Sequence, residues 1–139
     1  MASKGKILVV DDESSIRDIF DQVFNDAGYE VISTGGAKEA LAILKIQDID
    51  VIFLDLKLFG MNGIELCRQI RKTNPMSIIY AITGWAALFE IEECREAGFD
   101  DYFEKPLDMD MLLILVEQAF ARMGRWKRRY GTPQLKDGT

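Results

Sequence analysis

Short apolar runs alternate five times with longer amphipathic segments along this chain of 139 residues. The apolar runs span 6–10, 30–34, 51–55, 77–83 and 101–104, and apolar residues at helical spacing span 16–27, 37–46, 64–72, 86–97 and 109 toward 125. Parallel strands need long crossover connections, which the helical segments would supply. The pattern therefore predicts one α/β domain with a parallel sheet and helices on both of its faces.

The third apolar run, Val51 to Asp55, raises an electrostatic problem. It is apolar enough to lie wholly inside the protein, yet it ends on a carboxylate. Burying an ionised carboxylate without a partner is costly. The run therefore predicts a cationic partner for Asp55 elsewhere in the chain.

Polar residues stand at the ends of four of the expected strands. Since the carboxyl ends of parallel strands meet at one edge of a sheet, we expect these residues to share one crevice. Taken singly, the aspartates of the first strand end and the threonine could be helix caps, and the lysine a solvated charge. The residues are Asp11, Asp12 and Glu13 after 6–10, Asp55 after 51–54, Thr83 and Gly84 at the end of 77–83, and Lys105 and Pro106 after 101–104.

Three carboxylates in one crevice repel one another and need cations. Oxygen ligands without histidine or cysteine favour Mg²⁺, and Lys105 supplies a second positive charge beside Asp55. A carboxylate held ionised in this way is a nucleophile toward phosphorus. Thr83 would donate a hydrogen bond to the phosphoryl group, and Gly84 leaves room for a backbone N–H contact. The crevice therefore predicts formation of an aspartyl phosphate.

Composition excludes several other functions. The net charge of −6 divides into −11 over residues 1–121 and +5 over 122–139, so the body is a poor nucleic-acid binder. The chain has no histidine, which excludes histidine acid–base catalysis, phosphotransfer from its own histidine and histidine metal sites. No apolar run is long enough to span a bilayer, so we expect a soluble, cytoplasmic protein. Cys67 and Cys94 are expected in the core.

Four stretches, VVDDE, FLDLKLFGMNGIEL, AITGW and YFEKP, resemble in order and spacing the receiver domain of two-component response regulators. The resemblance covers about Lys6 to Met123. It implies a flavodoxin-like, doubly wound, five-stranded parallel sheet with strand order 2-1-3-4-5 and five helices on both faces. We therefore expect a disordered N-terminus at 1–5, a receiver domain at 6–123 and a basic tail or linker at 124–139.

The same resemblance implies roles for individual residues that capture and sense a phosphoryl group. Asp55 would be the phosphoacceptor, Asp12 a direct Mg²⁺ ligand, Asp11 a ligand largely through water, and the carbonyl of Lys57 a further ligand. Thr83 and Lys105 would be the phosphate-sensing pair, Tyr102 the switch aromatic that turns inward, and Lys105–Pro106 a candidate cis peptide.

Two positions depart from the family pattern, and a third is unusual. Phe59 stands where a proline is usual, and Gly84 where alanine is common. Trp85 and Lys57 occupy the variable positions that flank the phosphoryl group. We hypothesise that the Trp85 ring hinders the attacking water and lengthens the phosphoryl lifetime; the alternative is that it packs on the fourth helix.

The resemblance also implies partners. The donor would be a phosphohistidine on a sensor histidine kinase or a histidine phosphotransfer protein, and the receiver would have weak self-phosphatase activity. The output would pass to a downstream protein target or effector domain, with a homodimer through helix 4, strand 5 and helix 5 as one form. A haloacid-dehalogenase-like phosphatase is disfavoured because Lys57 stands where its second acid belongs. A non-phosphorylated pseudo-receiver would lack an acid, the threonine or the lysine, and all are present.

Overall fold

A computed structural model of the chain describes residues 2–84 and 88–130, and strands and helices alternate throughout this part. The elements are β1 (Lys6–Val10), α1 (Ser14–Asp26), β2 (Glu30–Thr34), α2 (Ala37–Ile46), β3 (Val51–Asp55), α3 (Gly63–Thr73), β4 (Ile78–Thr83), α4 (Leu88–Ala97), β5 (Asp101–Glu104) and α5 (Met109–Tyr130). The alternation that the apolar pattern predicts is confirmed.

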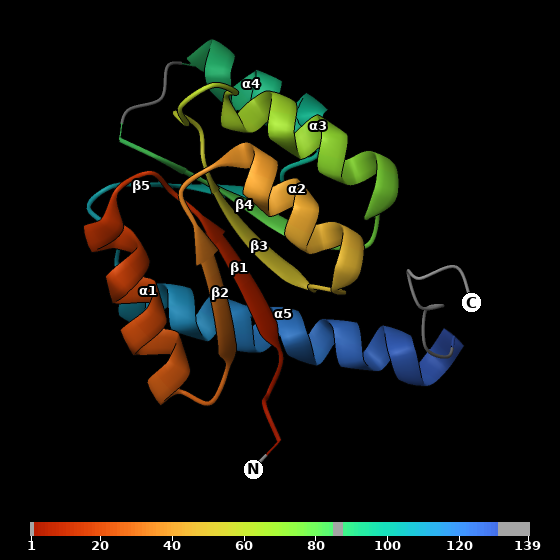
Figure 1. Cartoon of the computed structure of the whole chain (residues 1–139). Coiled ribbons are helices and arrows are strands. Elements are labelled where there is room, and N and C mark those ends of the chain that lie inside the picture. Colours follow the sequence, from red (N-terminus) through yellow and green to blue (C-terminus); the bar gives the residue numbers. More distant parts are fainter. Residues whose placement is uncertain (1, 85–87, 131–139) are drawn as a thin grey trace.

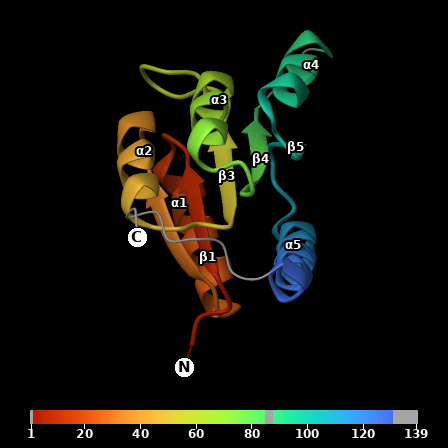
Figure 2. The same cartoon turned by 90° about the vertical axis from the view of Figure 1, so that its right-hand side faces the viewer.

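The sheet has five parallel strands in the order β2-β1-β3-β4-β5. Helices α1 and α5 cover one face, and α2, α3 and α4 cover the other (Figures 1 and 2). The chain runs from β1 outward to β2 and then returns to place β3 on the other side of β1. The strand order therefore reverses between β1 and β3, and a crevice at their carboxyl ends is the expected place for a site.

The core consists of two apolar layers, one on each side of the sheet. Strand β3 is buried along its whole length, including Asp55, because both of its faces are covered. On the side of α1 and α5, the rings of Phe20, Phe24, Phe53 and Tyr80 form a chain of contacts. Cys67 and Cys94 are both buried, as expected.

Several element boundaries differ from the expected ones. Helix α5 continues to Tyr130, beyond the residue 125 toward which its apolar positions run. Its last turns contain GRWKRRY, which has helix-forming cations and no proline. Of the N-terminal segment expected to be disordered, the structure describes residues 2–5, and the N–H of Lys4 donates to the carbonyl of Gly28 (2.9 Å). None of the helices in the described residues combines the length and hydropathy that crossing a membrane requires.

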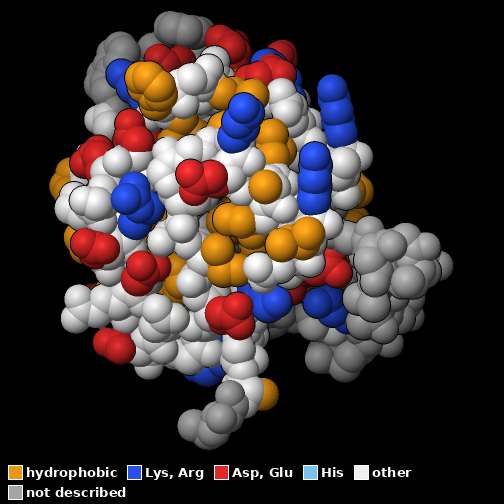
Figure 3. Space-filling model, in the orientation of Figure 1, with side chains coloured by type: hydrophobic (Ala, Val, Ile, Leu, Met, Phe, Trp, Pro, Cys, Tyr) orange, Lys and Arg blue, Asp and Glu red, His pale blue; other side chains and the backbone are white. Residues whose placement is uncertain are grey.

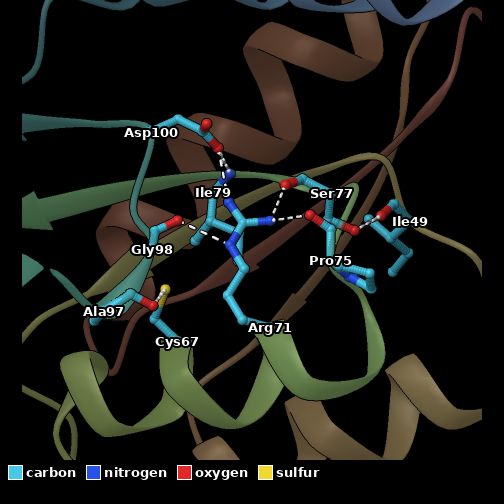
Figure 4. Close-up of polar contacts among 9 residues, drawn as sticks. All are labelled: Ile49, Cys67, Arg71, Pro75, Ser77, Ile79, Ala97, Gly98 and Asp100. Carbon is cyan, nitrogen blue, oxygen red and sulfur yellow. Dashed lines mark hydrogen bonds and ion pairs between the residues drawn. The ribbon is translucent and has the colours of Figure 1, made fainter. Parts of the chain in front are cut away.

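Arg71, on α3, connects the α3–β4 loop to the α4–β5 loop at the amino-terminal edge of β4 (Figure 4). Its Nε donates to the carbonyl of Gly98 (2.8 Å), and its Nη2 pairs with Oδ2 of Asp100 (2.9 Å). Its Nη1 donates to the carbonyls of Pro75 (3.0 Å) and Ser77. A planar guanidinium can serve these acceptors together, whereas an ammonium cannot.

Arg71→Lys is therefore expected to lower the free energy of unfolding by about 1–2 kcal/mol, since most of these hydrogen bonds are lost while the charge is kept. Denaturant unfolding of the variant and of the native protein measures the difference. The exposed Arg68, one turn earlier, pairs only with Glu65 in the described residues, so Arg68→Lys is the matched control and should change stability little. Equal stability of all three proteins would contradict this account of Arg71.

Candidate functional site

Three strands deliver buried polar side chains to the carboxyl edge of the sheet. Asp11 follows β1 directly and is 0% exposed, Asp55 ends β3 at 4%, and Thr83 ends β4 at 1%. Lys105 follows β5, and its N–H donates to the carbonyl of Thr83 (2.8 Å). The structure thus brings together the residues that the strand ends predict.

The cation that a buried Asp55 requires is Lys105. The Lys105 Nζ lies 3.4 Å from Oδ2 of Asp55 and 3.2 Å from Oδ2 of Asp11. Its shortest contact, 2.8 Å, is with Oε1 of Glu13. One ammonium therefore serves three carboxylates, and the negative charge of the crevice exceeds the positive charge that the lysine supplies.

The acidic residues form a cluster suited to a hard divalent cation. Asp11, Asp12, Glu13 and Asp55 can each direct an oxygen to within 4.8 Å of the others. Oδ2 of Asp11 is buried and accepts no hydrogen bond; its contact in the described residues is the ion pair with Lys105. An oxygen-only set with an unsatisfied buried carboxylate oxygen fits Mg²⁺.

Burial dominates the titration of Asp55. Removal from water, with a smaller contribution from the charge of Asp11, raises the pKa of this carboxyl, which comes to about 6. The hydrogen bond from the Lys57 N–H and the charge of Lys105 act in the opposite direction without offsetting burial. For Lys105, burial lowers the pKa, but the hydrogen bond to Glu13 and the charges of Asp55 and Asp11 raise it overall. Lys105 therefore stays cationic.

The loop after β3 holds the Asp55 carboxylate in place. Oδ1 of Asp55 accepts the N–H of Lys57 (3.0 Å), and the carbonyl of Leu56 accepts the N–H of Gly63 (2.9 Å). Helix α3 begins here because Oδ1 of Asn62 caps it by accepting the N–H of Glu65 (2.8 Å). A Cβ at position 63 would lie 2.9 Å from the Cα of Leu56, and closer still to the carbonyl oxygen of Asp55. Only glycine lets α3 start this close to the strand.

The remaining sequence-predicted residues differ in their placement. The Tyr102 side chain is on β5 and is 36% exposed, so in this structure it faces outward. The Lys105–Pro106 peptide is cis, as expected. Gly84 is exposed, and a Cβ there would meet no described atom within 4 Å, so space alone does not require glycine. Phe59 is 92% exposed, and Trp85 lies outside the described residues.

Three contributors were not assigned a role from the sequence. Glu13 was recognised at the strand end, but not as the nearest partner of Lys105. Arg17, on α1, donates from Nη1 to the backbone carbonyl of Asp11 (2.6 Å) and so fixes the β1–α1 turn. Gly63 permits the close approach of α3. The only sequence signal for these roles is the proximity of Glu13 and Arg17 to the acidic pair and the position of Gly63 after a helix-capping asparagine.

The fold and this crevice define a phosphoacceptor domain of signal transduction. The family model of the response regulator receiver domain matches residues 7–117, and the chain belongs to this family. Membership in this family argues against the alternative of a haloacid-dehalogenase-like phosphatase.

Known relatives are consistent with this assignment. The chain is 34% identical over 113 residues to sporulation initiation phosphotransferase F of Bacillus subtilis, covering 81% of this chain and 91% of the relative. It is 33% identical to the DNA-binding transcriptional regulator NtrC of Salmonella typhimurium, covering 85% of this chain but 25% of that protein. A CheY-like receiver domain from Methanospirillum hungatei superposes with a TM-score of 0.84 at 30% identity, covering 90% of this chain and 98% of that structure.

Proposed function

We propose that Asp55 accepts a phosphoryl group from a phosphohistidine donor and that the resulting change at the carboxyl edge transmits a signal. The observation that carries this proposal is the 3.4 Å contact between the Lys105 Nζ and Oδ2 of Asp55 inside an acidic cluster. A buried carboxylate beside a lysine, with further carboxylates able to hold a divalent cation, has the groups that phosphoryl transfer uses.

Each residue has a distinct part in the transfer. An oxygen of Asp55 attacks phosphorus as the bond from phosphorus to the donor's imidazole nitrogen breaks, and the electron pair leaves on that nitrogen. Asp11, Asp12, Asp55 and the carbonyl of Lys57 would hold Mg²⁺, which supplies charge neutralisation for the phosphoryl oxygens. Lys105 neutralises a second side of the phosphoryl group, and the Thr83 hydroxyl and Gly84 N–H donate hydrogen bonds to it.

The output would follow from movement of Thr83 and Lys105 toward the phosphoryl group. In this structure Tyr102 is exposed, and Met111 (42% exposed) and Ile114 (58%) lie on the outer side of α5. An inward turn of Tyr102 would change this surface of β5 and α5. This supports a downstream target, an effector domain or a homodimer that contacts α4, β5 and α5.

The remaining parts of the proposal concern donors, lifetime and location. The donor class is a sensor histidine kinase or a histidine phosphotransfer protein in the cytoplasm, and slow attack of water on the acyl phosphate would give weak self-phosphatase activity. Acidic and basic side chains are interspersed on the face shown in Figure 3, which agrees with a protein partner rather than direct nucleic-acid binding. The boundaries of the receiver domain at 6–123 and of the basic tail or linker at 124–139 stay predictions.

Incubation with acetyl phosphate and Mg²⁺, followed by mass spectrometry of the intact protein and of its peptides, tests the proposal. We expect one added phosphoryl group on the peptide that contains Asp55, and none in Asp55→Asn or when Mg²⁺ is chelated. Asp26→Asn, an exposed change at the end of α1, is the matched control and should be labelled as the native protein is. A label on another residue, or none in the native protein, would refute the assignment.

A further inference from the structure

Three carboxylates hold the Lys105 ammonium before any phosphoryl group arrives. The Nζ lies 2.8 Å from Oε1 of Glu13, 3.2 Å from Oδ2 of Asp11 and 3.4 Å from Oδ2 of Asp55. The contacts with Glu13 and Asp55 are hydrogen bonds, and the contact with Asp11 is an ion pair. A phosphoryl group on Asp55 therefore competes with these carboxylates for the ammonium, and Lys105 can move toward it only by lengthening at least one of the present contacts.

The contact with Glu13 costs least to give up. Asp11 and Asp55 are buried, and a buried carboxylate left without a partner is strongly unfavourable. The Glu13 side chain is 57% exposed, so water can replace the lysine there at once. The exchange that phosphorylation requires should therefore take place at Glu13.

We propose that Glu13 is a positioning residue that holds Lys105 in the unphosphorylated state and yields it to the phosphoryl group on Asp55. The contact stabilises only the state before transfer, so Glu13 slows phosphorylation and weakens binding of the phosphoryl group. Glu13 precedes α1 as its N-cap residue but makes no capping hydrogen bond through its side chain, so its contact with Lys105 is not a by-product of starting the helix. This inference rests on the proposed function of Asp55.

Glu13→Gln keeps the size of the side chain and removes its charge, which weakens the hold on Lys105. At saturating Mg²⁺ we expect the second-order rate of labelling by acetyl phosphate to rise about five-fold. The affinity for beryllofluoride, a phosphoryl mimic, should rise by a similar factor, as followed by tryptophan fluorescence. Denaturant unfolding establishes that the variant is folded.

A faster labelling rate in Glu13→Gln could come from release of Lys105 or from loss of a negative charge that repels the phosphoryl donor. Two comparisons distinguish these causes. Asp18→Asn makes the same change in net charge on the exposed surface of α1, without contact to Lys105, and should leave the labelling rate unchanged. Phosphoramidate carries less negative charge than acetyl phosphate at neutral pH, so a gain due to weaker repulsion would be smaller with it. A gain due to released Lys105 would be the same for both donors.

The double variant Glu13→Gln/Lys105→Met completes the test, because the effect of Glu13 should vanish once the lysine is gone. An unchanged or slower rate in Glu13→Gln, a gain confined to acetyl phosphate, or an equal gain without Lys105 would each overturn the inference. If Lys105→Met takes no measurable label, the comparison of the two donors decides. Absence of labelling in the native protein would instead count against the function proposed for Asp55.

Discussion

Asp55→Asn is expected to be more stable than the native protein at pH 7 when divalent metal is absent, by about 2–3 kcal/mol in the free energy of unfolding. Burial raises the pKa of Asp55 from 3.8 to about 6, so the folded protein holds its ionised form at a cost that the unfolded chain does not bear. Asparagine keeps the shape and can accept the hydrogen bond from the Lys57 N–H, but it does not ionise. The ionised carboxylate of Asp55 is thus expected to lower the free energy of unfolding of the native protein.

The dependence on pH follows from the sign of the shift. Below about pH 4 the carboxyl is protonated in both the folded and the unfolded state, and the variant should gain nothing. Between about pH 4 and pH 6 the folded state retains a proton that the unfolded state has released, so the stability of the native protein falls as pH rises. Above about pH 6 the difference between the two proteins should be constant.

Urea unfolding of both proteins between pH 4 and pH 8, with a chelator present, measures this difference. Mg²⁺ should reduce it, because the cation binds the folded native protein and lowers the cost of the carboxylate. Asp26→Asn, which alters an exposed carboxylate, should follow the native curve. A less stable Asp55→Asn at pH 7 would mean that attraction to Lys105 outweighs burial and the repulsion from Asp11.

The fold can be predicted well from the sequence because each strand and each helix is recognisable within its own short stretch of residues. Each strand is a continuous apolar run, and each helix shows its own apolar period, so the alternation can be recognised without knowing any long-range contact. The requirement of Asp55 for a cation can be predicted in the same way, from one buried run that ends on a carboxylate. Topology then places Lys105 at the same edge.

Features that depend on interatomic distance could not be predicted. The sequence does not show that Lys105 lies nearer to Glu13 than to Asp55, since the two acids are far apart in the chain and the distances depend on the final packing. The extension of α5 to Tyr130 was missed because the apolar period fades near residue 125, and because Gly124, a weak helix former, does not end the helix. The outward placement of Tyr102 reflects one conformational state, which no local pattern specifies.

Gly63→Ala is expected to lower the free energy of unfolding by about 3 kcal/mol and to slow labelling by acetyl phosphate at least about ten-fold. The added Cβ would meet the Cα of Leu56 at 2.9 Å and would come closer still to the carbonyl oxygen of Asp55. Both are backbone atoms, which cannot turn aside as the end of a flexible side chain can. Either α3 or the end of β3 must shift, and the shift moves the phosphoacceptor.

Gly36→Ala is the matched control for this change. Gly36 precedes α2 with a φ of −136°, and a Cβ there would meet no described atom within 4 Å. Gly36→Ala should lower the free energy of unfolding by less than about 1 kcal/mol, because alanine is less favourable than glycine at an N-cap position. It should leave the labelling rate unchanged. Because Gly63→Ala acts on both the packing of α3 and the position of Asp55, stability and labelling should fall together. If it matched Gly36→Ala in both measurements, α3 would be free to move away from β3, and the close approach at Gly63 would have no part in holding the site.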